Sequence, residues 1–394
     1  MKKIVLFTGG TETLAFFSRQ LAGYLKELGH DVFLFDLYNI KMDIWDLRWF
    51  CEGGNVVTLT FNFNGICGEE IFLNEDGTFF WDTLDIPVIN IVVDHPFYYH
   101  KYLNHLPQKY VHISIDRFHE AYMKEYFPEV ALGPLVPLAG TALKPLKDTL
   151  PIEKRPYDIV FTGNYTSPHA YDNVIERNGP EYANFYHGII DDLIAHPDTP
   201  MEKAFYSHIK REMPELSTSE VKQCMESLIF IDLYVRFYFR AEAIRTLADN
   251  GLPVKIYGKG WDELSCAHPE NIHFENKLLT SLECLEGLEQ GKISLNVMPW
   301  FKDGAHDRIF NSQLNGAVCL TDESIYLKEI FTDGKEICFY SLDKLDELPK
   351  IATGLLSDND LLLSIQENGY QAALENHTWG DRAVILSNYI ERYS

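Results

Sequence analysis

Short apolar runs alternate with amphipathic stretches along the first part of the chain. Residues 4–7 (Ile-Val-Leu-Phe) are apolar throughout, which predicts a buried strand. Between Leu14 and Leu28 the apolar side chains recur at helical spacing, and Gly29 ends this predicted helix. Residues 31–37 form the next predicted strand. A strand, a helix and a strand in this order predict a βαβ unit, and therefore a parallel sheet.

The alternation continues to the end of the chain and indicates two domains. Further strands are expected at residues 56–61, 88–93, 111–115, 157–161, 254–257, 293–297 and 337–340. Residues 132–156 hold five prolines and little periodicity, so we expect the crossing between domains there. We predict an α/β fold with an N-terminal domain at residues 1–150 and a C-terminal domain at residues 151–378. Residues 168–230 are rich in charge and helix formers, which predicts a helical insertion.

Composition narrows the range of partners. The formal net charge of −24 argues against sequence-independent nucleic-acid binding, which needs clustered Lys and Arg. It also disfavours docking on anionic lipid by charge alone. A ligand that carries phosphate must therefore be bound by a few individual basic side chains, because the overall electrostatic potential of the protein is negative. The seven cysteines form no Cys-x2-Cys pair, which favours reduced core residues and a cytoplasmic location. No apolar run approaches the length of a transmembrane helix, so no integral membrane segment is expected.

The segment from Asp303 to Asp322 is the most informative part of the chain. Asp303-Gly-Ala-His-Asp-Arg308 predicts a turn that leads into a short helix, and Ala317–Leu320 predicts the buried strand that follows. A helix N-terminus carries free N–H groups and a positive dipole, which makes it an anion site. The planar fork of Arg308 matches a phosphate. This combination suits the diphosphate of a sugar nucleotide.

Together with His377-Thr-Trp-Gly-Asp-Arg382, this segment resembles the GT-B glycosyltransferases, especially the group-1 type related to the CgeB spore-maturation proteins. The resemblance covers residues 155–394. It implies two Rossmann-like domains facing across a cleft, with the C-terminal helix at 379–394 packed back on the first domain. It also implies a nucleotide-sugar donor, with no cofactor and no metal.

The resemblance assigns roles to residues of this segment, with one departure from the family pattern. Many retaining GT-B enzymes carry a Glu-x7-Glu pattern, whose two positions are Asp303 and Asn311 in this chain. Asp303 would contact sugar hydroxyls, and Asn311 would contact the ribose as a neutral amide. Arg308 and the helix amides near His306 would hold the diphosphate. The match supports nucleotide-sugar binding better than it supports a retaining mechanism.

Two more turns at strand ends are candidates for the donor site, because ligands bind at the carboxyl ends of parallel strands. The first is Gly163-Asn164-Tyr165, whose amides would face a phosphate or sugar. The second is Tyr257-Gly258-Lys259-Gly260, where Lys259 can meet a phosphate and the glycines let the backbone approach a ligand. The alternative in each case is a turn with no role beyond its geometry.

Acceptor-side chemistry is expected in the first domain. Asp94 and His95 follow a predicted strand, so His95 is placed to act as general base toward an acceptor hydroxyl, with Asp94 orienting the ring. Asp94 can itself be the base, or the pair can be a structural turn. The loop Thr8-Gly9-Gly10-Thr11 is a candidate phosphate or acceptor loop, and the alternative is a tight turn. Asp116 and His119, after the next strand, are expected to be structural.

The sequence therefore predicts a metal-independent, hexosyltransferase-like glycosyltransferase that moves a sugar from a nucleotide-diphosphate sugar, expected to be UDP-linked, to a hydroxyl. The acceptor, whether glycan, protein or lipid, stays open. Asp358 and Asp360 form an Asp-x-Asp pair, but Asp is a common helix-capping residue, so no metal ligand is assigned. A sugar-nucleotide epimerase of the same fold and a non-catalytic nucleotide-sugar-binding module are the alternatives, the second favoured by the neutral Asn311.

Overall fold

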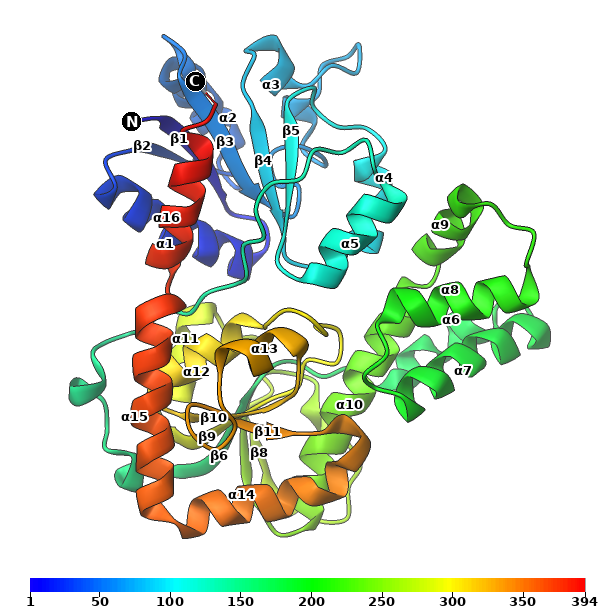
Figure 1. The fold of residues 1–394 in the computed structure, drawn as a ribbon, viewed down its shortest axis with the longest axis vertical. Helices are drawn as coiled ribbons and strands as arrows, with labels where there is room; N and C mark the ends of the chain where they lie inside the picture. The colour runs from blue at the N-terminus through cyan, green and yellow to red at the C-terminus, as the bar shows by residue number, and fades with distance from the viewer. Residues whose placement is uncertain (394) are drawn as a thin grey trace. The chain divides into compact units, whose positions relative to one another are not determined.

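The computed structural model describes residues 1–393 and divides into two compact units (Figure 1). Unit 1 comprises Met1–Ala139 and the C-terminal segment from His377, and unit 2 comprises Gly140–Asn376. The sequence predicted the boundary at residue 150, but the chain joins unit 2 earlier. A Cβ on Gly140 would lie 2.6 Å from the backbone of Phe310, so the chain already packs tightly on unit 2 at that point.

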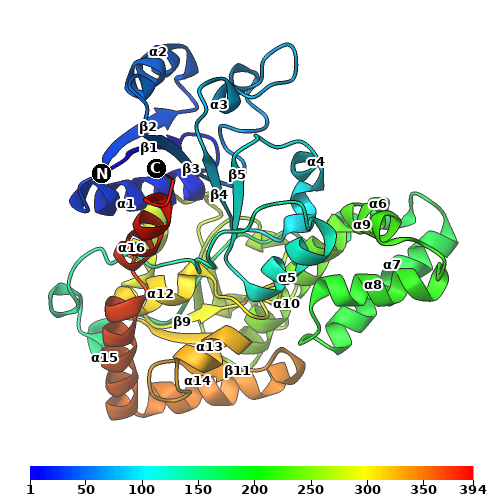
Figure 2. The same ribbon diagram turned by 45° about the horizontal axis from the view of Figure 1, so that its top comes forward.

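Unit 1 is built on a five-stranded parallel sheet in the order β2-β1-β3-β4-β5. The strands are β1 (Lys3–Thr8), β2 (Asp31–Asp36), β3 (Val56–Phe61), β4 (Val88–Val92) and β5 (Tyr110–Ser114). The helices are α1 (Glu12–Glu27), α2 (Ile40–Cys51), α3 (Phe80–Thr83), α4 (His100–Leu103), α5 (Arg117–Tyr126) and α16 (Trp379–Ile390), with 3-10 turns η1 (Glu70–Phe72) and η2 (Pro96–Tyr99) (Figure 2). The strand order reverses between β1 and β3, where sheets of this kind bind ligands.

Unit 2 is built on a six-stranded parallel sheet in the order β11-β10-β9-β6-β7-β8. The strands are β6 (Tyr157–Thr162), β7 (Val254–Tyr257), β8 (Ile272–Phe274), β9 (Gly291–Asn296), β10 (Val318–Asp322) and β11 (Cys338–Tyr340). The helices around the sheet are α10 (Ile229–Asp249), α11 (Ser281–Leu288), α12 (Asp307–Leu314), α13 (Ile325–Ile330), α14 (Leu348–Ser357) and α15 (Asn359–Asn376). This is the Rossmann strand order, with its switch point between β6 and β9. The predicted pair of Rossmann-like α/β domains is confirmed.

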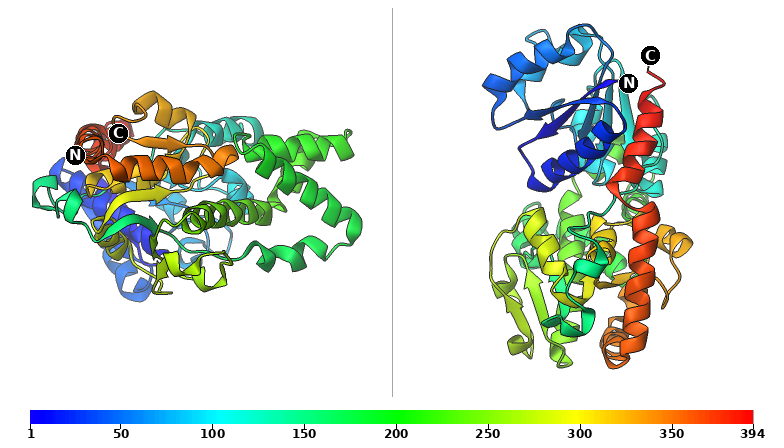
Figure 3. Two further views of the ribbon diagram at one scale, coloured as in Figure 1. Left: turned by 90° about the horizontal axis from the view of Figure 1, so that it is seen from below. Right: turned by 90° about the vertical axis from the view of Figure 1, so that its left-hand side faces the viewer.

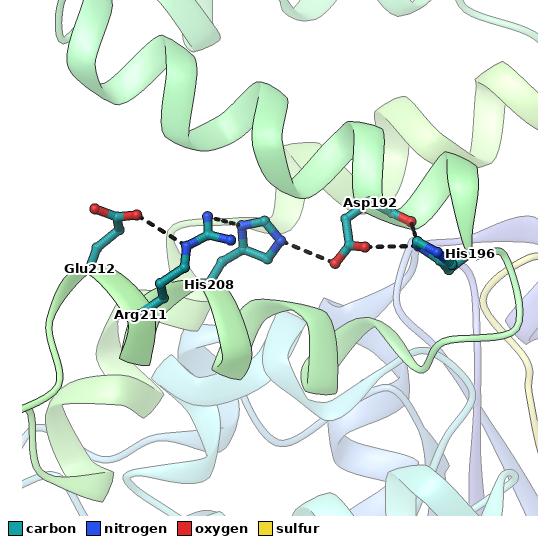
Figure 4. A network of polar contacts seen from close by, with 5 residues as sticks. All are labelled: Asp192, His196, His208, Arg211 and Glu212. Carbon is teal, nitrogen blue, oxygen red and sulfur yellow. Dashed lines mark hydrogen bonds and ion pairs between the residues drawn. The ribbon is translucent and has the colours of Figure 1, made fainter.

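A helical insertion follows β6 in unit 2. It holds η5 (Pro168–Tyr171), α6 (Asp172–Glu176), α7 (Pro180–Ala195), α8 (Met201–Glu212) and α9 (Thr218–Glu226), and the long α10 leads back to the sheet (Figure 3). A polar network joins α7 to α8 (Figure 4). The buried His208 lies 3.0 Å from an Arg211 nitrogen through Nδ1 and 3.1 Å from Asp192 through Nε2. Because a guanidinium only donates, Nδ1 accepts, and Nε2–H donates to the carboxylate. Asp192 also contacts His196.

The C-terminal helix α16 completes the core of unit 1 by packing against α1. The buried Trp379 ring lies 4.9 Å from the Phe17 ring and 6.0 Å from the Phe61 ring, measured between centroids. Arg382 donates through Nε to the Pro137 carbonyl at 2.7 Å, which secures the other side of the helix. The His377–Arg382 motif of the sequence is therefore a packing element of unit 1.

Replacing Trp379 with alanine should destabilise unit 1 by about 3–5 kcal/mol, since it leaves a large cavity between α16 and α1. Val384→Ala, on an exposed position of the same helix, should change stability by less than about 0.5 kcal/mol. Hydrogen exchange of the α1 amides, measured with denaturant unfolding, checks both variants. Equal protection in the two variants would contradict the packing role of Trp379.

Candidate functional site

The turns after β6 and β7 pack directly on one another in unit 2. The Gly163 amide donates to the Tyr257 carbonyl at 2.9 Å, and the Asn164 side chain accepts from the Lys259 amide at 3.0 Å. A Cβ on Gly258 would lie 2.1 Å from the Gly163 oxygen. Gly258 is thus required by the close approach of two backbones, apart from any role toward a ligand. The two predicted donor-site turns form one structure at the switch point of the sheet.

Aromatic side chains lie beneath these turns. Trp261 donates through Nε1 to the Gly163 carbonyl at 2.8 Å and stacks on the Tyr165 ring at 5.0 Å. Both side chains are buried. Gly260 has φ of +86°, and a Cβ there would lie 2.0 Å from the Tyr165 oxygen. The side chain of Tyr165 therefore supports the turn from within unit 2, which leaves the turn's backbone and Lys259 as the groups that can reach a ligand.

Helix α12 begins next to these turns, in the segment that the sequence singled out. His306 is its N-cap, because His306 Nδ1 accepts from the Arg308 amide at 3.2 Å. Burial, and next the Arg308 charge, lower the pKa of His306 to about 4, so its ring is neutral at pH 7. The Arg308 side chain reaches the glycine turn: a Cβ on Gly163 would lie 3.4 Å from Arg308 Nη1.

A second arginine, Arg240 on α10, meets the same turn. Arg240 is buried and donates through Nη1 to the Asn164 carbonyl at 3.1 Å. Two buried nitrogens here have no hydrogen-bond partner, Nε of Arg240 and Nη1 of Arg308. Burial, and then the charges of Arg308 and Arg236, lower the pKa of Arg240 well below its usual range. Two guanidinium groups with unused donors therefore converge on the Gly163–Asn164 turn.

Trp300, in the loop after β9, contributes an aromatic face to this cluster. The Arg236 guanidinium lies 4.1 Å from its ring centroid and the Arg240 guanidinium lies 5.2 Å from it. Arg236 also pairs with Asp232 at 2.8 Å. The sequence interpretation missed Arg236, Arg240 and Trp300. The available signal was a pair of arginines four residues apart on a helix that is otherwise rich in aromatic and aliphatic residues.

Both polar atoms of the Asn311 side chain form hydrogen bonds within unit 2. Its Oδ1 accepts from the Thr141 amide at 2.8 Å, and its Nδ2 donates to Asp307 at 2.9 Å. The ribose contact assigned to Asn311 stays a prediction, and it would have to compete with these bonds. Asp303 is buried in the loop between β9 and α12. That loop is fixed where Ser324 Oγ donates to the Gly304 carbonyl at 2.7 Å.

Asp322, at the carboxyl end of β10, also holds this loop. Its Oδ1 accepts from the Met298 amide at 2.8 Å, while its buried Oδ2 has no hydrogen-bond partner. Burial raises the pKa of Asp322 to about 6. The side chain thus positions the start of the segment that carries Trp300 and Asp303.

In unit 1, Asp94 belongs to a polar network at the carboxyl ends of β3 and β4. Asp94 Oδ2 accepts from Asn62 Nδ2 at 2.9 Å and from the Tyr99 hydroxyl at 3.0 Å. Asn62 Oδ1 in turn accepts from the Val93 amide at 2.8 Å. Within residues 1–393 the hydrogen bonds of this carboxylate go to Asn62 and Tyr99, so Asp94 is held independently of the neighbouring imidazole.

His95 lies in a buried cluster of rings. Its Nδ1 accepts from the Phe97 amide at 3.2 Å, which caps η2. The His95 ring centroid lies 4.3 Å from that of Phe97, 4.6 Å from that of His119 and 4.8 Å from that of Tyr122. Burial lowers the pKa of His95 to about 3. Such an imidazole is a weak base, and the general-base roles assigned to His95 and Asp94 stay predictions.

The Thr8–Thr11 loop follows β1 at the switch point of unit 1. Gly9 has φ of +80°, and a Cβ there would lie 2.8 Å from Asp36 Oδ1. The Gly10 carbonyl accepts from the Tyr38 hydroxyl at 2.7 Å. Thr11 is the N-cap of α1, but its side chain makes no capping hydrogen bond. The glycines are required by the turn itself, and the phosphate or acceptor role of this loop stays a prediction.

Acidic, histidine and cysteine side chains do not gather into a metal cluster in the described part of the chain. Among residues 1–393, no group of three or more of these side chains is arranged to hold a metal ion. Asp358 Oδ1 accepts from the Leu361 amide at 3.0 Å, as a helix cap would.

None of the helices within residues 1–393 combines the length and apolar character needed to cross a bilayer.

Comparison with known proteins shows a partial family match and several similar folds. Residues 240–388 match the family model described as glycosyl transferase-like. The whole chain resembles, at 10% identity and a TM-score of 0.50, a sucrose-phosphate synthase from Thermosynechococcus elongatus, 99% of which is covered. It also resembles AviGT4, a glycosyltransferase involved in avilamycin A biosynthesis, at 12% identity, a TM-score of 0.52 and coverage of 100% of this chain and 98% of that chain.

An α-glucosyltransferase in complex with UDP is a third similar structure, with 11% identity, a TM-score of 0.54 and coverage of 100% of this chain and 99% of that chain. A search of curated proteins gave no significant match. The chain therefore has the GT-B fold, and residues 240–388 match the glycosyl transferase-like family model. The finer relation to the CgeB-related group stays a prediction.

Acidification should destabilise unit 1 through its buried histidines. Burial lowers the pKa of both His95 and His112 from 6.5 to about 3. The stability that each neutral ring contributes is complete above pH 6.5 and is lost as the pH falls toward 3. At pH 4 the loss is on the order of 3 kcal/mol for a single such group. Denaturant unfolding at several pH values measures it.

His112→Gln should flatten this pH dependence, because it removes one of the groups that must take up a proton. His105→Gln is the control, since His105 is exposed in the same unit. An unchanged slope of stability against pH in His112→Gln would show that this buried ring does not drive the acid sensitivity.

Proposed function

We propose that the protein is a glycosyltransferase that moves a sugar from a UDP-sugar to a hydroxyl group of an acceptor. The observation that carries the proposal is the pair of arginines at the switch point of unit 2. Arg240 and Arg308 both reach the Gly163–Asn164 turn, and each keeps a buried nitrogen without a partner. A similar structure was solved with UDP, which supports the choice of nucleotide.

The charge balance of this cluster favours a bound dianion. Arg236 forms an ion pair with Asp232, and the nearby charges of Asp307 and Asp232 act on Arg308 and Arg240. Within residues 1–393, however, neither Arg240 nor Arg308 forms a direct ion pair with a carboxylate. Burying like charges close together is unfavourable unless an anion compensates them. A diphosphate would supply the negative charge and accept from the unused guanidinium donors. Lys259 and the backbone of its turn are placed at the same edge of the sheet.

The chemistry follows from these positions. In transfer, the bond between the anomeric carbon and the diphosphate oxygen breaks, and the acceptor oxygen forms the new bond to that carbon. Arg240 and Arg308 would stabilise the charge that develops on the leaving diphosphate. Asp94 would take the acceptor proton, and His95 is the alternative base. Asp303 is assigned to sugar hydroxyls, Asn311 to the ribose, and the Thr8–Thr11 loop to a phosphate or the acceptor.

An assay with a panel of UDP- and GDP-sugars tests the proposal by release of the nucleoside diphosphate. Release or transfer from at least one donor is expected. An epimerised donor formed without acceptor would identify an epimerase. Donor binding with no turnover would identify a non-catalytic module, and no binding to any donor would remove nucleotide sugars from consideration.

Arg308→Ala and Arg240→Ala should each weaken UDP binding about tenfold or more. Loss of one charged hydrogen-bonding partner typically costs about 1.5–3 kcal/mol. Arg177→Ala makes the same change of charge at an exposed position of unit 2 and should leave the affinity unchanged. Calorimetric titration with UDP measures all three variants. Wild-type affinity in both Arg240 and Arg308 variants would place the diphosphate elsewhere.

Asp94→Asn should lower kcat by about 10²–10⁴-fold while UDP affinity is retained, because the base acts on the acceptor and not on the nucleotide. His95→Gln should mainly lower the melting temperature, since His95 is a buried cap of η2. Steady-state kinetics and thermal unfolding of the two variants separate these roles. The reverse order of kcat effects would make His95 the base.

A further inference from the structure

In unit 1 the chain leaves β3 through two consecutive residues in the left-handed region. Asn62 has φ of +46° and Phe63 has φ of +65°. Residues other than glycine rarely adopt positive φ; Asn does so more readily than most, but a bulky residue such as Phe is a clear outlier there. Strained backbone of this kind persists only where the surrounding structure enforces it, and it is often found at functional sites. The turn lies at the carboxyl edge of the sheet, where parallel sheets bind their ligands.

Contacts with β4 and with the segment after it hold this turn. The Asn62 amide donates to the Ile91 carbonyl at 3.1 Å, and the Phe63 amide donates to Asn90 Oδ1 at 3.1 Å. The Phe63 side chain is buried, and its ring lies 5.1 Å from the Tyr99 ring, measured between centroids. Because these contacts fix the backbone of the turn, they also fix the direction in which the Asn62 side chain leaves it.

The Asn62 side chain makes two hydrogen bonds that have different consequences. Its Oδ1 accepts from the Val93 amide at 2.8 Å, which ties the turn to the end of β4. Its Nδ2 donates to Asp94 Oδ2 at 2.9 Å. An aspartate at position 62 could also accept from the Val93 amide, but the bond to Asp94 needs a donor, which an ionised aspartate lacks. An amide rather than a carboxylate at this position therefore matters for Asp94 and not for the turn.

The two carboxylate oxygens of Asp94 have different surroundings. Oδ2 accepts from Asn62 and also from the Tyr99 hydroxyl at 3.0 Å. Within residues 1–393 no donor is bonded to Oδ1, and the Asp94 side chain is only half-buried. Two donors on one oxygen fix the plane of the carboxylate. They leave the other oxygen as the one that can accept from a ligand.

We propose that Asn62 is a positioning residue, which holds Asp94 so that Oδ1 is the atom that takes the acceptor proton. This inference rests on the proposed transferase function with Asp94 as the base. In that step the acceptor O–H bond breaks and the proton bonds to Oδ1. The acceptor oxygen bonds to the anomeric carbon, and the diphosphate leaves with the electron pair of the broken C–O bond. Asn62 acts only through the direction that it gives to the carboxylate.

The test is the steady-state kinetics of nucleotide release from the donor that the sugar-nucleotide panel identifies, with water as the acceptor. Asn62→Gly keeps the left-handed backbone, which glycine adopts freely, and removes both side-chain bonds. Asn62→Asp retains the bond to the Val93 amide but sets a second carboxylate beside Asp94, and two carboxylates this close share a proton. Both variants should lower kcat by about tenfold to a hundredfold, the usual effect of displacing a catalytic group slightly. The KM for the donor and the UDP affinity should not change.

Asn55→Gly is the matched control, because Asn55 is exposed in the same unit and also has a positive φ, of +59°. It should keep the kcat of the wild type. Thermal unfolding of every variant verifies that the fold persists, and Asn62→Asp decides the question if Asn62→Gly does not fold. A merely structural Asn62 predicts wild-type kcat in Asn62→Asp, which retains the bond to Val93. That result would overturn the proposal.

A double-mutant cycle links the effect to Asp94. In the Asp94→Asn background, Asn62→Gly should lower kcat little further, because the carboxylate that Asn62 positions is gone. Full addition of the two losses would show that Asn62 acts on another group and would refute the proposal. If the wild type releases no nucleotide from any donor, the transferase function fails and the positioning role fails with it. If the wild type turns over and the Asn62 variants turn over equally well, the positioning role alone is refuted.

Discussion

The convergence of Arg240 and Arg308 on one glycine turn is the constraint around which unit 2 is arranged. Two like charges are brought into a region of low dielectric, so the surrounding groups must be fixed to tolerate them. The Asn164 carbonyl accepts from Arg240, and Trp300 offers its ring face to the same guanidinium. The tight packing of Gly258 on Gly163 holds that carbonyl in place. The charges of Asp307, on Arg308, and of Asp232, on Arg240, partly offset this like-charge pair.

Much of the fold follows from local sequence. Strands such as Ile4–Phe7 are apolar without interruption, which is what a parallel strand covered on both faces requires. Gly258 and Gly260 predicted the turn after β7. The alternation of predicted strands and helices in both halves of the chain predicted two Rossmann-like domains. The segment around Arg308 was predicted to lie at the ligand edge, because it follows the carboxyl end of a buried strand, where open parallel sheets bind their ligands.

The rest of the site depends on contacts that local sequence does not contain. Arg240 reaches Asn164 from 76 residues away, and nothing in an aromatic-rich helix predicts that partner. Asn311 is held by Thr141, which lies 170 residues earlier in the chain. His95 follows a strand, as a catalytic residue would, yet rings from His119 and Tyr122 enclose it. In each case the position of the side chain is set by contacts with residues that lie far away in the sequence.

The return of α16 to unit 1 has a consequence for how the protein is made. Unit 1 takes its residues from both ends of the chain, with all of unit 2 between them. During synthesis the sheet of unit 1 emerges first, but Phe17 and Phe61 lack their Trp379 partner until unit 2 has been translated. Unit 2, contiguous in sequence, can finish folding earlier. Until then the nascent N-terminal sheet keeps part of its apolar surface uncovered, which exposes it to aggregation during synthesis.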